Sequence, residues 1–228
     1  MNKFCLIVPA FHYNRVSRCL KSLLSFDLGF DHDIFIIHNK FETNIQNRRS
    51  RSREEIDTIS KMGIALDKRY SNIKYFERQN VGEDIGAYRA GYLEVLKSDY
   101  QYYFFIAEMA VSKRGGWLKE YNDMFQGNKS IGLICPHIGF GKKYTFVIKS
   151  SYFCIRKELV LDDWPRPLSR KDTEWQEMEY FYPAVKKRDF FAMHYGTGID
   201  HLSYLNDKNK ESHTKFLIPG KLLGDFLV

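Results

Sequence analysis

The chain has 228 residues, of which 44% are hydrophobic and 16% aromatic, and it carries a formal net charge of +7. This length suits one large domain, and the apolar content is too high for an intrinsically disordered chain. No stretch approaches the roughly 20 apolar residues of a membrane-spanning helix, and Pro9 ends the first apolar run before it reaches the length of a secretory signal. We therefore expect a cytoplasmic protein, with peripheral membrane contact left open.

The basic charge limits the kinds of binding partner, and the cysteine pattern limits metal and disulfide sites. A positive surface attracts nucleic acid, anionic lipid or a phosphate-bearing substrate. The densest basic run, Arg48–Arg53, has no interleaved aromatic residues, so we interpret it as a solvated loop and expect no nucleic-acid partner. The four cysteines are scattered without a Cys-x-x-Cys pair, which argues against a zinc site and a disulfide framework.

The apolar periodicity predicts alternating strands and helices in the first half of the chain. The expected buried strands and the helices between them are strand 3–8, a helix through Val16–Leu24, strand 34–37, helix 54–67, strand 73–76, helix 85–97, strand 102–106, a helix from about 116 and strand 131–135. Strands that lack polar alternation and alternate with helices indicate a mostly parallel sheet covered on both faces.

The second half of the chain has a different character. Residues 144–155 form a longer β-like stretch, and 174–187 is expected to be a helix. We therefore divide the domain into a nucleotide-sugar-binding α/β half, 1–142, and an acceptor-side half with a C-terminal extension, 143–228.

Several common enzyme classes are excluded by missing motifs. The sequence contains no Gly-x-x-x-x-Gly-Lys-Ser/Thr, no Gly-x-Gly-x-x-Gly after the first strand and no Gly-x-Ser-x-Gly. These absences argue against a P-loop nucleotidase, a dinucleotide-dependent oxidoreductase and a serine hydrolase, respectively.

Ligands of such sheets bind beyond the carboxyl ends of the strands. That rule selects four segments, Pro9–Asn14, His38–Phe41, Asn80–Asp84 and Ala107–Val111. Gly82 can supply a positive φ or let a ligand approach the backbone closely. Asp84 is placed either to cap the next helix or to contact a ligand.

The motifs in these segments resemble those of glycosyltransferases. Residues 7–11 and 19–24 are similar to the opening strand and helix of family 2 glycosyltransferases, and Asn80–Tyr88 is similar to the Asn-x-Gly-x-Asp-x-Gly-Ala pattern of rhamnan-synthesis-type transferases. The resemblance covers roughly residues 3–185 and implies a GT-A-like fold that binds a nucleotide-sugar donor. The donor-binding residues we expect are Pro9, Phe11, Asn39, Asn80, Gly82, Asp84 and Arg114.

The resemblance also implies an acidic metal site after the fourth strand. There these families hold Mn²⁺ or Mg²⁺ against the donor diphosphate, and such hard cations prefer oxygen ligands. In this chain Glu108 is the only carboxylate of the segment, and His194 is a further expected ligand. The alternatives are weak metal binding, a degenerate enzyme, or stabilisation of the diphosphate by basic side chains instead. The candidates for the last role are Arg78, Arg89, Lys113 and Arg114.

An inverting transferase needs a general base for the acceptor hydroxyl. By the resemblance it lies at the start of a late helix, where Asp172, Glu174 and Glu177 are the candidates. Taken one at a time, these residues also fit a capped helix with an acidic first turn. Trp175 fits either stacking on a sugar ring or a core position.

Together these patterns predict a glycosyltransferase that moves a sugar, with inversion, from a nucleotide donor to a bacterial surface glycan such as a polysaccharide or lipopolysaccharide. The resemblance implies a lipid-linked acceptor. The alternative is a non-catalytic member of the same fold that binds a sugar nucleotide or a partner enzyme, favoured by the single acidic residue at Glu108.

Overall fold

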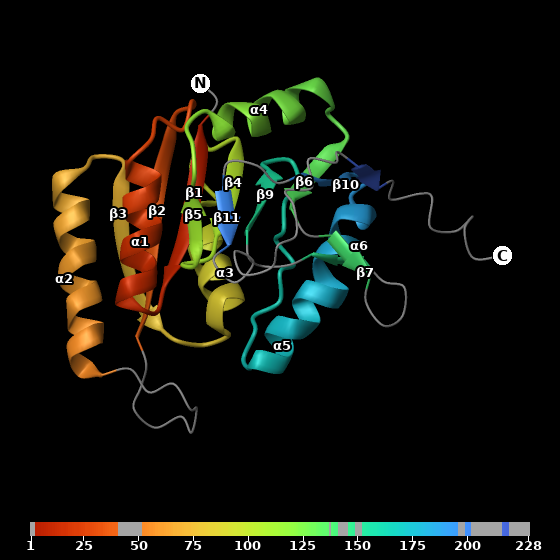
Figure 1. Ribbon diagram of the computed structural model, residues 1–228. Coiled ribbons are helices and arrows are strands. Elements are labelled where there is room, and N and C mark those ends of the chain that lie inside the picture. Colours follow the sequence, from red (N-terminus) through yellow and green to blue (C-terminus); the bar gives the residue numbers. More distant parts are fainter. Residues whose placement is uncertain are drawn as a thin grey trace.

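The structure is a mixed sheet with helices on both faces (Figure 1). The computed structural model describes residues 3–40, 52–136, 138–140, 146–148, 152–195, 199–201 and 216–218.

The main sheet is built around four parallel strand pairs. In the described residues it has eight strands, in the spatial order β12 (Phe216–Ile218), β10 (Phe191–His194), β6 (Ile131–Cys135), β9 (Tyr152–Arg156), β4 (Tyr102–Ile106), β1 (Phe4–Ala10), β2 (His32–Lys40) and β3 (Ile73–Gln79). The pairs of β1 with β2, β2 with β3, β1 with β4 and β6 with β10 are parallel. The antiparallel pairs all involve β9 or β12, which come from the second half of the chain.

The helices complete two apolar cores, one on each face of the sheet. Their bounds are α1 (Tyr13–Leu24), α2 (Arg53–Arg69), α3 (Glu83–Val95), α4 (Trp117–Gly127), α5 (Arg170–Trp175) and α6 (Phe181–Lys187). Strand β1 shows why both faces are covered, because its side chains point to opposite faces in turn. Phe4, Leu6 and Val8 belong to the core that contains α1 and α4, whereas Cys5 and Ile7 belong to the core that contains α3 and α6.

Two short strand pairs lie outside the main sheet. Strand β5 (Ala110–Ser112) pairs with β11 (Ile199–His201), and β7 (Ile138–Phe140) pairs with β8 (Phe146–Ile148). The β-like stretch expected over 144–155 contains two separate strands in the described residues, β8 and β9, and these belong to different sheets.

The late helix also differs from the expectation for 174–187. It begins earlier, at Arg170, because Ser169 caps it, and a π-helical turn, η1 (Gln176–Tyr180), separates α5 from α6. A π-turn inside a helix is often found at functional sites.

The remaining architectural expectations fare differently. The α/β class with a mostly parallel sheet is confirmed, whereas the division at residue 142 stays a prediction. All four cysteines are free and buried, as expected of small apolar residues. In the part of the chain that is described, no helix has the length and hydropathy needed to cross a membrane.

Candidate active site

The carboxyl ends of the parallel strands bring the predicted segments to one edge of the sheet. Ala10 at the end of β1 pairs with His38 on β2, and Asn39 on β2 pairs with Arg78 on β3. Asn80 follows directly, and its backbone N–H donates to the carbonyl of Lys40. Pro9 and Phe11 are buried at the same edge. Five of the expected donor-binding residues thus lie on neighbouring strand ends or in the loops after them: Pro9, Phe11, Asn39, Asn80 and Gly82.

Glu108 holds the loop between β1 and α1. It is buried, and its Oε2 accepts hydrogen bonds from the backbone N–H groups of Phe11 at 2.7 Å and His12 at 2.8 Å. Its Oε1 lies 3.5 Å from Nη1 of Arg15 on α1. Because both carboxylate oxygens already have partners, Glu108 serves here as an anchor for the loop.

Asp84 is the carboxylate at this edge with the most unusual electrostatics. It is half-buried at the second position of α3. Burial, followed by the negative charges of Glu108, Glu83 and Glu177, raises the pKa of Asp84 to about 7, while Arg15 opposes that shift. A carboxylate held among other carboxylates is one that a cation or a hydrogen-bond donor of a ligand would stabilise.

The turn before Asp84 has the backbone geometry that a glycine permits. Gly82 has φ 76° and ψ 27°, as the sequence predicts, and Glu83 also has a positive φ, of 47°. Gly82 is the N-cap of α3, so the alternative in which Asp84 caps this helix is wrong. A Cβ at Gly82 would lie 2.4 Å from Cγ of Pro167, so this turn packs against the segment that leads into α5.

The helix after that segment is tied to the same turn. The hydroxyl of Thr173 on α5 donates to the carbonyl oxygen of Gly82 at 3.1 Å. Trp164 donates from Nε1 to Oε1 of Gln176 at 2.8 Å, and the amide of Gln176 donates to the carbonyl oxygen of Pro165. These bonds place the first residues of η1 beside the N-terminus of α3.

The three candidate bases are not equivalent. Asp172 forms a capping box with Ser169 and accepts from the backbone N–H groups of Leu168 and Ser169, which holds its pKa below the ordinary value. Glu174 is exposed and pairs with Arg170 at 3.0 Å. Both contacts stabilise the helix start.

Glu177 is the candidate base that the fold brings to Asp84. It is half-buried on η1, and its charge contributes to the raised pKa of Asp84 and to that of Tyr88. The structure therefore brings Asp84, Glu108 and Glu177, from three separate segments, close enough for the charges of Glu108 and Glu177 to act on Asp84.

Three further expected residues lie elsewhere or outside the described parts. Arg114 pairs with Glu120 at 2.6 Å, and Glu120 also accepts a hydrogen bond from Tyr195. His194 ends β10, and its side chain lies outside the described residues. Trp175 is 43% exposed and donates to Glu179, so it is not a core residue.

Sequence reasoning missed Arg15 and Thr173. Arg15 is the cation that acts on both Asp84 and Glu108, and Thr173 ties α5 to Gly82. Arg15 directly follows Asn14, the last residue of a segment that we did expect at the sheet edge. Thr173 carried no such signal, because its partner is 91 residues away.

A divalent metal does not fit the described side chains as a resident ion. No group of three or more His, Cys, Asp or Glu residues among them is arranged to hold one. Glu108 already accepts two backbone N–H groups and faces Arg15, so binding an ion would require it to release those partners. A metal that arrives with a ligand would therefore have to be held by Asp84 without Glu108.

Comparison with known proteins gives the fold a context. No protein-family model matches the sequence, and no curated protein does. Among solved structures, the chain is similar to the mannosyltransferase PcManGT from Pyrobaculum calidifontis in complex with GDP-Man and Mn²⁺, with a TM-score of 0.53 and 9% identity over 83% of this chain and 53% of that one.

A second similar structure is that of TarS from S. aureus, with a TM-score of 0.50 and 12% identity over 82% of this chain and 34% of that one. The chain therefore spans about half the length of the first structure and about a third of the second. These similarities, at such low identity, concern the fold: the chain has a GT-A-like α/β fold, a mostly parallel sheet flanked by helices.

Proposed function

We propose that this chain is a glycosyltransferase that binds a nucleotide-sugar donor at the carboxyl edge of the sheet. The observation that carries the proposal is the meeting of Asp84, Glu108 and Glu177 at this edge of a GT-A-like fold. The mannosyltransferase structure with the same fold holds GDP-Man and Mn²⁺. The motif at Asn80–Tyr88 supports the rhamnan-synthesis-type resemblance.

In this proposal Asp84 receives a hydrogen-bond donor of the nucleotide sugar, and Arg15 offsets the charge of the diphosphate. Asp84 suits the first role because its neighbours are mostly carboxylates, so an incoming donor group lowers the cost of its negative charge. Arg15 suits the second because its side chain is 40% exposed while its guanidinium is held beside Glu108. Binding of Mn²⁺ or Mg²⁺ together with the donor, at Asp84, stays a prediction.

Glu177 is the base we propose for the acceptor hydroxyl, with inversion at the transferred sugar. Of the three candidates it alone is linked electrostatically to Asp84, whereas Asp172 and Glu174 are occupied at the helix start. The acceptor we propose is a bacterial surface glycan, polysaccharide or lipopolysaccharide, carried on a lipid at the cytoplasmic face of the membrane. Peripheral attachment belongs to the same proposal.

The competing function is a non-catalytic protein of this fold that binds a sugar nucleotide or a partner enzyme. One observation favours it: Glu108, in the position of the acidic metal motif, is used to hold the β1–α1 loop. Donor turnover separates the two functions, because a binding protein leaves the nucleotide sugar intact.

The test is turnover of UDP-, GDP-, dTDP- and CMP-sugars by the chain and by two matched variants. Glu177→Gln should bind the donor as the wild type does and lose at least about a hundredfold in transfer, the usual contribution of a general base. Glu174→Gln, a neighbour on the same helical segment, should transfer at the normal rate. Equal rates in the wild type and Glu177→Gln would remove Glu177 from the chemistry, and no turnover of any donor would favour the binding protein.

A further inference from the structure

Three arginines gather on the outer face of α3, away from the carboxylates of the candidate active site. Arg89 lies on this helix, Arg78 is the next-to-last residue of β3 with its guanidinium near Gly86, and Arg166 belongs to the segment before α5 that packs on Gly82 and accepts a hydrogen bond from Arg89. At 100° per residue, Gly82, Gly86 and Arg89 share one side of α3, whereas Asp84 and Gly91 share the other. A Cβ at Gly91 would lie 2.7 Å from Ile7 of β1, which shows that the side of Asp84 faces the sheet.

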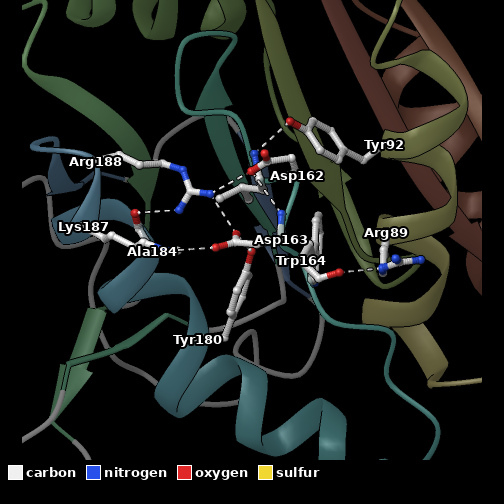
Figure 2. A network of polar contacts seen from close by, with 10 residues as sticks. Arg89, Tyr92, Asp162, Asp163, Trp164, Tyr180, Ala184, Lys187 and Arg188 are labelled. Atoms are coloured by element: carbon white, nitrogen blue, oxygen red, sulfur yellow. Dashed lines mark hydrogen bonds and ion pairs between the residues drawn. The ribbon is translucent and has the colours of Figure 1, made fainter.

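Two of these arginines, Arg78 and Arg89, are held by neutral oxygen acceptors in the described residues. Arg78 donates from Nη1 to the amide oxygen of Asn39 at 2.9 Å and from Nη2 to the carbonyl oxygen of Val81 at 2.8 Å. Arg89 donates from Nε to the carbonyl oxygen of Trp164 at 2.8 Å, as Figure 2 shows. Within the described residues, the ion pairs of the chain include none of Arg78, Arg89 and Arg166.

The segment that carries Arg166 is fixed in place. Figure 2 shows Asp162 and Asp163 meeting Arg188 of the α6 end at 3.0 and 2.8 Å, and Tyr180 donating to Asp163 at 2.9 Å. Nearby, Pro167 packs on Gly82. The backbone on both sides of Arg166 is therefore anchored, and its exposed side chain lies in the neighbourhood of the other two arginines.

The like charges of this arginine cluster repel one another. Burial, and then the charges of Arg166 and Arg89, lower the pKa of Arg78 to about 10. The charges that act on Asp84 are instead those of Glu108, Glu83, Glu177 and Arg15. Arg89 and Asp84 also lie on opposite sides of α3, and among the described residues no ion pair gives Arg78, Arg89 or Arg166 a carboxylate partner.

We propose that Arg78, Arg89 and Arg166 form a second ligand site, one that binds a phosphate group on the outer face of α3. Guanidinium groups suit phosphate oxygens because their fork of N–H donors matches two oxygens at once. Arg78 is held in position by its two hydrogen bonds, while Arg166 is exposed and able to close on the ligand. The phosphate comes either from a small phosphate ester or from a lipid headgroup, and the site does not depend on donor turnover.

The experiment titrates pyrophosphate into the full chain by calorimetry and, separately, sediments the chain with vesicles. We expect the Arg89→Gln/Arg166→Gln variant to bind pyrophosphate at least about tenfold more weakly, since two charge-assisted contacts are lost. The matched control is Arg170→Gln, an exposed arginine four residues further on that pairs with Glu174. It should change the affinity by less than about twofold, as expected of a surface ion pair away from the ligand.

A single variant separates weaker binding from loss of folding, and vesicle sedimentation separates the two sources of phosphate. Arg166→Gln alone removes an exposed side chain and should leave the thermal midpoint unchanged while weakening binding. Vesicles of phosphatidylcholine with phosphatidylglycerol, but not phosphatidylcholine alone, sediment the chain if the source is a lipid. Pyrophosphate binding without sedimentation identifies a soluble phosphate ester.

Three results would overturn the proposal: no pyrophosphate binding by the wild type, unchanged affinity in the double variant, or an equal loss in Arg170→Gln. Failure of the proposed transferase would look different. Every nucleotide sugar would then remain intact, while pyrophosphate would still bind and would still be lost in the double variant.

Discussion

The region around Glu108 and the region around Asp84 lie at the same edge of the sheet and use a carboxylate in opposite ways. Glu108 follows β4 and accepts two backbone N–H groups from the β1–α1 loop, so its charge is satisfied by the protein itself. Asp84 begins α3 on a left-handed glycine turn and has other carboxylates as its main neighbours. The contacts of Glu108 stabilise the folded chain, whereas the negative charge of Asp84 would be stabilised by a bound ligand.

The largest effect is expected when the carboxylate of Glu108, which anchors the β1–α1 loop, is removed. Glu108→Ala leaves the N–H groups of Phe11 and His12 without their charged acceptor in a buried place. Each hydrogen bond to a charged group is worth about 1.5–3 kcal/mol, so the free energy of unfolding should fall by about 3–6 kcal/mol. Urea denaturation measures it. Glu108→Gln, which keeps an acceptor oxygen, should lose less, and an unchanged stability in Glu108→Ala would refute the anchoring role.

Removing the charge of Asp84 should have the opposite effect and raise the free energy of unfolding. Its pKa is about 7 in the folded chain against an ordinary value of 3.8, so the folded state keeps a proton that the unfolded chain has released between these pH values. The associated stability is present below pH 3.8 and is lost as pH rises through 7. At pH 8, Asp84→Asn should be more stable than the wild type by up to about 4 kcal/mol, at 1.36 kcal/mol per pKa unit.

The measurement is urea denaturation of both proteins from pH 4 to pH 8. The gain should shrink toward zero at the acid end, because near pH 4 the wild-type carboxyl is protonated in the folded chain and about half protonated in the unfolded chain. A gain that is the same at every pH would show that packing, and not charge, separates the two proteins.

The turn that presents Asp84 should be intolerant of a side chain. In Gly82→Ala, the new Cβ would lie 2.4 Å from Cγ and 2.6 Å from the carbonyl oxygen of Pro167. The left-handed conformation adds about 1–2 kcal/mol for a residue with a Cβ, so we expect a total loss above about 2 kcal/mol. Gly127→Ala is the control, because a Cβ there meets nothing within 4 Å and should be neutral or stabilising. Equal thermal midpoints for the two variants would contradict this account.

The smallest effect is expected at Asp172, the carboxylate of the capping box. Asp172→Ala should lower the free energy of unfolding only slightly, because the side chain of Ser169 still caps the helix, and it should leave sugar transfer unchanged. Parallel denaturation and turnover measurements check both parts. A variant that is stable but does not transfer would return Asp172 to the candidate bases.

The first half of the fold could be predicted from the sequence because its strands are short, continuous apolar runs. The run Tyr102–Ile106 is buried in full, as its composition indicates. Strand β9 could not be placed in this way, because its position between β4 and β6 follows from pairing with residues 20 or more positions away. Local periodicity carries no information about such partners.

The site was predictable to the extent that it follows from strand ends. Gly82 was expected either to supply a positive φ or to let a ligand approach the backbone, and the structure shows the positive φ. The capping role of Asp84 failed by two positions, because helix boundaries are the least certain part of a sequence-based assignment. The anchoring role of Glu108 and the link from Thr173 to Gly82 are contacts over about 90 residues or more, which only the folded chain reveals.

The central claim is that the edge around Asp84 binds a nucleotide sugar, and the most direct test is a thermal-shift screen of UDP-, GDP-, dTDP- and CMP-sugars in Mn²⁺ and in EDTA. The account predicts that one nucleotide class raises the midpoint, since a ligand at a hundredfold excess over its dissociation constant stabilises the folded state by about 2.7 kcal/mol. It further predicts that Asp84→Asn loses most of this shift, and the comparison of Mn²⁺ with EDTA decides whether a metal binds together with the donor at Asp84. No shift with any donor in either condition would contradict the claim, and a shift that EDTA abolishes would show that the carboxylates of this edge bind a metal after all.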